Sequence, residues 1–108
     1  MTRLVVVTGS GRGGLGFDIA HRLAGSGDRI VIAEKNPDLA GQAAATLCGQ
    51  GFDATAIVTD IADKASVAEL ATAVQRLGGA DALVNNAALA DASVVTLFGS
   101  WTKTSSRG

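Results

Sequence analysis

A chain of 108 residues that is 47% apolar and 18% charged is long enough for one domain with a buried core, and this composition excludes a disordered chain. The formal net charge of −1 and the scattered basic residues provide no field that would attract nucleic acid or an anionic membrane. The single cysteine, Cys48, excludes an internal disulfide, and the first apolar run is too short for a signal peptide or membrane span, so we expect a cytoplasmic protein.

Four short apolar segments are typical of buried strands. They are residues 3–8 (RLVVVT), 29–34 (RIVIAE), 54–59 (ATAIVT) and 82–87 (ALVNNA). Each is rich in β-branched residues or small apolar ones, and glycine or polar residues border them. Their continuous apolar character favours strands that are covered on both faces.

Three segments with helical spacing separate these strands. The first runs over about 15–24, the second over 37–49 or 37–51, and the third over about 64–77. Asn36, followed by a proline, and Asp63 are the expected N-caps of the second and third helices. Glycines follow each segment and are expected to end it.

The alternation of strands and helices predicts an α/β fold with a doubly wound parallel sheet, Rossmann-like, with four strands and three helices. Right-handed crossovers favour the strand order 3-2-1-4. We expect residues 1–90 to form a half domain of this type, and residues 91–108, which have no clear period, to form an irregular tail.

The segment TGSGRGGLG, residues 8–16, lies between the first strand and the first helix and contains Gly9, Gly11, Gly13, Gly14 and Gly16. The pattern G-x-G-x-x-G occurs twice in it. A helix N-terminus has unpaired N–H groups and a partial positive charge, and glycines let a diphosphate approach them. The position between a strand and a helix favours a phosphate-binding loop over a flexible glycine turn without a ligand.

Glu34 ends the second strand, 20 positions after Gly14. A carboxylate there can accept hydrogen bonds from the two ribose hydroxyls of an adenosine, and it would repel a 2′-phosphate, so it favours NAD over NADP. Lys35 and Arg12 favour the opposite choice, because either could contact a 2′-phosphate. The alternative for Glu34 is an ordinary surface carboxylate.

Four motifs at consistent spacing now form one pattern: Thr8-Gly9 with Gly14-Leu15-Gly16, Glu34, Asp60-Ile61, and the segment DALVNNAA at 81–88. In these motifs the chain resembles the short-chain dehydrogenase/reductase family, over about residues 3–90. Two departures are visible. The usual family loop, T-G-x-x-x-G-x-G, has one residue fewer between its first two glycines, and the family's N-N-A-G is N-N-A-A here, with Ala88 replacing glycine.

The resemblance implies a cofactor-binding role for each motif. The pyrophosphate would be wrapped by Thr8, Gly9, Ser10, Gly11, Arg12, Gly13, Gly14, Leu15 and Gly16. Glu34 would bind the adenosine ribose, and Asp60 would bond the adenine amino group, with Ile61 packed beside the ring. The cofactor channel would be lined by Asn86, Ala87 and Ala88, and Asn85 with Asn86 would also tie the central strands together. Two alternatives stay open: Asp60 caps the following loop, and the asparagines are structural.

The resemblance also implies hydride transfer between a nicotinamide and a carbonyl or alcohol, with a tyrosine as acid/base, a lysine four positions later and a serine. The chain has no tyrosine, so we assign no catalytic residue and no metal ligand. His21 is expected to be solvated, and Cys48 to be a small packed residue.

The leading interpretation is therefore the cofactor-binding part of an oxidoreductase, in which residues 1–90 form a half domain that binds NAD(P). This part would be inactive alone and able at most to bind the dinucleotide. One explanation is a truncated or frameshifted gene, because LFGSWTKTSSRG can be encoded so that another frame reads an acidic segment typical of the family. The alternative is a non-catalytic NAD-binding module that acts with a partner chain. A methyltransferase is a third reading, which the N-N-A segment and Asp60 disfavour. The fourth strand, as an apolar edge, predicts self-association.

Overall fold

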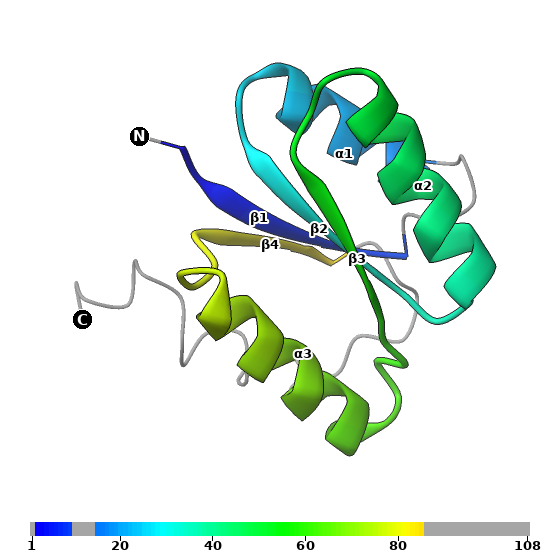
Figure 1. Ribbon diagram of the computed structural model, residues 1–108. Helices are drawn as coiled ribbons and strands as arrows, with labels where there is room; N and C mark the ends of the chain where they lie inside the picture. The colour runs from blue at the N-terminus through cyan, green and yellow to red at the C-terminus, as the bar shows by residue number, and fades with distance from the viewer. Residues whose placement is uncertain (1, 10–14, 86–108) are drawn as a thin grey trace.

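The computed structural model describes residues 2–9 and 15–85 of the chain. Strands and helices alternate: β1 (Leu4–Thr8), α1 (Leu15–Gly25), β2 (Arg29–Glu34), α2 (Pro37–Gly49), β3 (Ala54–Val58), α3 (Lys64–Arg76) and β4 (Ala82–Asn85). All the strand pairs are parallel, and the order across the sheet is β3-β2-β1-β4 (Figure 1). The predicted doubly wound fold, its strand order and its elements are confirmed.

The direction of winding changes at β1. The chain moves from β1 through α1 to β2, and through α2 to β3, and then returns through α3 to β4 on the other side of β1. Helices α1 and α2 cover one face of the sheet, and α3 covers the other (Figure 1). In open parallel sheets, the crevice at the carboxyl ends of the strands beside such a reversal is where ligands bind.

Alternating residues of the central strands supply two apolar cores. Val5 and Val7 of β1 and Ile30 and Ile32 of β2 pack against α1 and α2, where the buried partners are Ala20, Ala24, Ala43 and Leu47. The intervening strand residues pack against α3, and this second core contains Leu4, Val6, Val31, Ala33, Val67, Leu70, Val74 and Ala80. Because β1 and β2 are buried on both faces, their continuous apolar sequences are explained.

The helix ends follow the predicted capping pattern. The side chain of Asn36 accepts hydrogen bonds from the backbone N–H groups of Asp38 and Leu39, and that of Asp63 accepts one from Ala65. Helix α3 ends before Gly78, whose φ of +110° is a backbone conformation that favours glycine. Within the described part of the chain, no helix is long and apolar enough to cross a membrane.

Candidate functional site

Residues at the ends of the four strands, or directly after them, lie together at the carboxyl end of the sheet. We call this set the carboxyl rim: Thr8, Gly9, Glu34, Asp60 and Asn85. The strand register brings them to one level, since Thr8 lies beside Asn85 on β4 and beside Ala33 on β2, and Glu34 lies beside Val58, two residues before Asp60. Residues that are up to 77 positions apart in the sequence thus share one end of the sheet.

Thr8 and Asn85 join the two central strands at this rim. The Thr8 hydroxyl is fully buried and donates to Oδ1 of Asn85 at 3.0 Å. The bond fixes the side chain of Asn85 beside the reversal point of the sheet. The expectation that Asn85 ties the central strands together is confirmed, whereas its neighbour Asn86 lies outside the described residues.

Gly9 turns the chain away from the sheet after β1. Its φ is +68°, in the left-handed region, and its N–H donates to the carbonyl oxygen of Ala33 on β2 at 3.1 Å. A side chain at this position would strain the backbone, so glycine is required here by the turn itself, as well as by any close ligand. Helix α1 then begins at Leu15, with Gly16 buried in its first turn.

Glu34 is half-buried at the end of β2. Its carbonyl oxygen accepts the N–H of Thr59 at 2.9 Å, and its carboxylate oxygen Oε2 accepts the backbone N–H of Asn36 at 3.0 Å. The sequence predicted Asn36 as a helix cap and did not reveal this second bond. The available signal was the spacing: a carboxylate two residues before an extended Asn-Pro pair can bond the main-chain N–H ahead of it.

Asp60 and Ile61 follow β3. The Asp60 carboxylate accepts the N–H of Ala62 at 3.0 Å, its carbonyl oxygen accepts the N–H of Asp63, and its own N–H donates to Oγ of Ser66 at 2.9 Å. These bonds support the alternative in which Asp60 caps the loop before α3. Ile61 packs partly against the core on the α3 face. The contact of both residues with an adenine stays a prediction.

His21 and Cys48 do not belong to the carboxyl rim. His21 is exposed, with its ring 6.2 Å from that of Phe17 and 5.8 Å from that of Phe52, and its Nε2 lies 2.9 Å from Oε1 of Gln50. These contacts join α1 to the loop before β3. Cys48 is exposed, so its expected packing is wrong; its position late in α2 turns it outward, where the thiol donates to the carbonyl oxygen of Ala54 at 3.2 Å.

Eight of the predicted site residues lie outside the described residues, and so does the tail at 91–108. They are Ser10, Gly11, Arg12, Gly13, Gly14, Asn86, Ala87 and Ala88. The structure brings together the predicted residues on both sides of these gaps, from Gly9 to the start of α1 and as far as Asn85 on β4.

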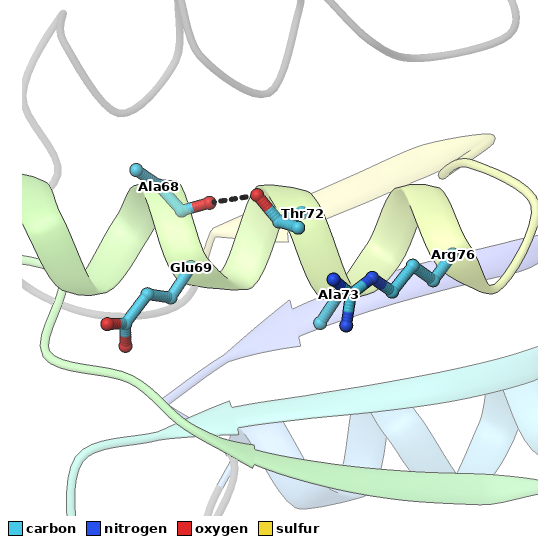
Figure 2. Close-up of a pocket in the computed structure, with 5 residues that line it drawn as sticks. All are labelled: Ala68, Glu69, Thr72, Ala73 and Arg76. Atoms are coloured by element: carbon cyan, nitrogen blue, oxygen red, sulfur yellow. Dashed lines mark hydrogen bonds between the residues drawn. The ribbon is translucent and has the colours of Figure 1, made fainter.

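A shallow cavity of about 360 Å³ lies along α3, and none of its described lining residues belongs to the carboxyl rim. Its described lining comes from that helix alone: Ala68, Glu69, Thr72, Ala73 and Arg76 (Figure 2). The bond drawn between Thr72 Oγ1 and the carbonyl oxygen of Ala68, 3.1 Å long, lies within the helix. None of these residues matches a predicted site residue, so the cavity adds nothing to the rim.

The fold and the rim together define a class of protein. A parallel sheet that reverses at β1, a glycine turn before α1 and an acid at the end of β2 are the features with which doubly wound proteins bind dinucleotides. The family model described as "short chain dehydrogenase" matches residues 3–104. The chain belongs to the short-chain dehydrogenase family of oxidoreductases.

Relatives agree with this assignment. An uncharacterized oxidoreductase of Bacillus subtilis, YxjF, is 35% identical over 97 residues, which are 89% of this chain and 37% of that protein. Human dehydrogenase/reductase SDR family member 4 is 42% identical over 89 residues, 81% of this chain and 31% of that protein. The chain therefore spans about a third of the length of these two relatives.

A solved structure shows the same arrangement of elements. The crystal structure of L-sorbose reductase from Gluconobacter frateurii, complexed with NADPH and L-sorbose, superposes with a TM-score of 0.81 at 27% identity. The match covers 92% of this chain and 45% of that one. A nicotinamide dinucleotide is thus the cofactor that the family and this neighbour support.

Proposed function

We propose that this chain binds NAD at the carboxyl rim, as the cofactor-binding part of an oxidoreductase that transfers hydride between a nicotinamide and a carbonyl or alcohol. The observation that supports this most is the juxtaposition of Gly9 and Glu34 at neighbouring strand ends. The N–H of Gly9 bonds the residue directly before Glu34, so the start of the glycine loop and the acid have a fixed separation.

In this proposal each part of the rim contacts one part of the cofactor. The pyrophosphate lies against residues 8–16 and the N-terminus of α1, the ribose hydroxyls bond Glu34, and the adenine lies beside Asp60 and Ile61. The loop-capping bond to Asp60 uses one acceptor position, and a carboxylate has about four, so the two roles are compatible. Residues 86–88 line the channel toward the nicotinamide.

The choice between NAD and NADP depends on charge near the adenosine ribose. Glu34 would repel a 2′-phosphate, whereas Lys35 is exposed beside it and could pair with one. The L-sorbose reductase structure holds NADPH, so the shared fold admits the phosphorylated cofactor in that protein. We propose NAD for this chain, because Glu34 lies at the end of β2 and the N–H of Asn36 holds its carboxylate there, where it would repel a 2′-phosphate.

The chain would not catalyse the reaction by itself. Its 108 residues include no tyrosine, the residue that the family resemblance implies as acid/base. The catalytic groups would have to come from a further polypeptide segment. That segment is encoded either in the same gene or in a separate gene for a partner chain. The nucleotide sequence of the gene distinguishes these two possibilities, since the first requires that the gene also encodes a tyrosine-lysine segment.

We also propose that β4 is a surface through which the chain associates with a second copy of itself. Among the described residues β4 pairs with β1 alone, and its four residues are half-buried. Strand edges of this kind pair readily with other chains. Sedimentation analysis would show dimers or larger species, and a single monomeric species over a wide concentration range would contradict association. Cytoplasmic location remains part of the proposal.

Calorimetric titration of the chain with NAD, NADP and S-adenosylmethionine tests the proposed function. We expect saturable NAD binding that weakens about tenfold or more in Glu34→Ala, because this substitution removes the charge-assisted hydrogen bonds to the ribose. Glu34→Gln is the matched control: it keeps the length of the side chain and an acceptor, and we expect it to tolerate NADP better than the natural chain does. Absence of NAD and NADP binding, or binding that is indifferent to Glu34, would contradict the proposal, and tight binding of S-adenosylmethionine would favour a methyltransferase.

A further inference from the structure

We infer that Asn36 is a positioning residue for the cofactor: its main-chain N–H holds the Glu34 carboxylate toward the ribose and so enforces the preference for NAD. The inference rests on the proposed function, because it explains how the proposed ribose acceptor is oriented. The relevant bond joins the Asn36 nitrogen to Oε2 of Glu34 at 3.0 Å. Because the donor is main chain, no substitution pattern in the sequence would reveal it.

Asn36 is itself held at several points. Its Oδ1 accepts the N–H groups of Asp38 at 2.9 Å and Leu39 at 3.1 Å, and its carbonyl oxygen accepts the N–H of Ala40 at 2.9 Å. Its backbone is extended, with φ of −86° and ψ of 117°, which is the conformation that a following proline favours. Helix α2 and Pro37 therefore orient the N–H that bonds Glu34.

The backbone of Glu34 is also held by hydrogen bonds. The carbonyl oxygen of Glu34 is bonded to the N–H of Thr59 after β3, and the next residue toward the N-terminus, Ala33, is bonded to Gly9. The backbone on both sides of the side chain is therefore tied to neighbouring strands. A glutamate side chain free in solution samples many rotamers, and holding one of its oxygens reduces the entropy that is lost when ribose hydroxyls bind.

Lys35 is the reason why the orientation of Glu34 would affect the choice between NAD and NADP. Lys35 is exposed directly between Glu34 and Asn36, and its ammonium group could neutralise a 2′-phosphate. A carboxylate that swings away would leave that cation unopposed and admit NADP. A carboxylate that is held beside the strand end keeps its repulsion where the 2′-phosphate would lie. The ratio of the two dissociation constants, NADP over NAD, is therefore the quantity that Asn36 controls.

A pair of substitutions at one position isolates the N–H. Asn36→Ala removes the side-chain cap and keeps the N–H, whereas Asn36→Pro removes both, and the φ of −86° is close to that which proline adopts. Both are measured by calorimetry in the full 108-residue chain, with circular dichroism to verify folding. We expect the NADP/NAD ratio to fall about fivefold from Asn36→Ala to Asn36→Pro, because NAD binds more weakly while NADP binding stays the same or tightens.

The same pair in a Glu34→Ala background completes the test. We expect the difference between alanine and proline at position 36 to disappear there, because the N–H then has no carboxylate to hold. A merely structural effect would weaken both cofactors equally and would persist without Glu34. Equal ratios for Asn36→Ala and Asn36→Pro, alongside NAD binding that depends on Glu34, would overturn the inference and leave the proposed function intact.

If Asn36→Pro does not fold, Pro37→Ala replaces it: this variant keeps the N–H and relaxes the extended backbone of Asn36, and the ratio is expected to fall two- to threefold, so an unchanged ratio overturns the inference. If the natural chain binds neither dinucleotide, the proposed function fails and the positioning role fails with it.

Discussion

At the amino ends of the strands, charged side chains bond to groups far away in the sequence, whereas at the carboxyl rim the carboxylates bond to main-chain N–H groups two residues ahead. Arg3 donates two hydrogen bonds to Asp28, at 3.0 and 2.7 Å, across 25 positions. Asp81 accepts the N–H of Leu4 at 2.8 Å across 77 positions, and its own N–H returns a bond to the Leu4 carbonyl oxygen. We call this set, with Arg29 and Asp53, the amino rim.

The carboxyl rim shows the opposite pattern. Glu34 accepts the N–H of Asn36, and Asp60 accepts the N–H of Ala62, each within a local turn. Both bonds lie within the turns that follow β2 and β3, whereas the bonds of the amino rim join segments that are far apart in the sequence. We therefore expect the amino rim to contribute more to stability, and the carboxylates of the carboxyl rim to contribute more to the proposed binding of the cofactor. Substitutions at the two rims should therefore affect different measurements.

The largest effect on stability is expected for Asp81→Ala at the amino rim. The substitution leaves the N–H of Leu4, a residue only 2% exposed, without its acceptor, and unsatisfied buried donors cost about 1–3 kcal/mol. We expect the free energy of unfolding to fall by about 2 kcal/mol in urea titrations. NAD affinity, measured where the variant is folded, should not change. A selective loss of affinity without a loss of stability would contradict the division between the rims.

Gly9→Ala comes next, and it should affect both quantities. A left-handed φ costs a residue with a Cβ about 1–2 kcal/mol, so stability falls by that amount. If the backbone relaxes instead, the bond from Gly9 to Ala33 is lost and the start of the loop moves. We therefore expect weaker NAD binding as well, measured by calorimetry. Gly25→Ala is the control, because a Cβ there meets no atom within 4 Å and no positive φ is involved.

Much of the fold could be predicted because local signals and tertiary contacts agree. The β-branched runs are the buried strands, Asn36 and Asp63 cap the helices that were expected, and the reversal at β1 follows from handedness rules. The exception is Cys48, because a small apolar residue on an alanine-rich helix has no periodic signal that tells the buried side from the exposed side.

The sequence predicted which residues lie at the carboxyl end of the sheet, but it did not predict the hydrogen bonds that they form. The position of Glu34 followed from its place at a strand end, whereas its bond to Asn36 depends on the main-chain path after β2. Likewise, Asp60 could be read as a cofactor ligand or a loop cap, and the bonds to Ala62 and Ser66 support the second role without testing the first. Side-chain pairs such as Arg3 with Asp28 were not predicted, because no local pattern joins them.

Thr8→Val is expected to have a smaller effect, and it probes the long-range bond that the carboxyl rim does contain. Valine has nearly the shape of threonine, so the change removes the hydroxyl that donates to Asn85 and retains most of the packing of a fully buried residue. We expect a loss of about 1 kcal/mol in urea titrations. A loss well above this value would mean that the rim holds the sheet together as strongly as the amino rim does.

The smallest effect is expected when both partners are replaced together, Arg3→Met with Asp28→Asn, because no buried charge is then left without its partner. Arg3 is more than half exposed, although its partner Asp28 is nearly buried, so water and salt screen much of the attraction. The thermal midpoint should fall slightly, and the difference from the natural chain should shrink as salt is raised. The hydrogen bond and charge of Asp28 raise the pKa of the Arg3 guanidinium. The raised pKa of Arg3 means that the ion pair contributes its full stabilisation at any pH below the pKa of arginine in the unfolded chain. This contribution is lost only in strong alkali, so the difference in stability should not change between neutral pH and about pH 9. A difference that grows with salt would show that Arg3 acts through packing, and the amino rim would then owe its stability to Asp81 and Leu4.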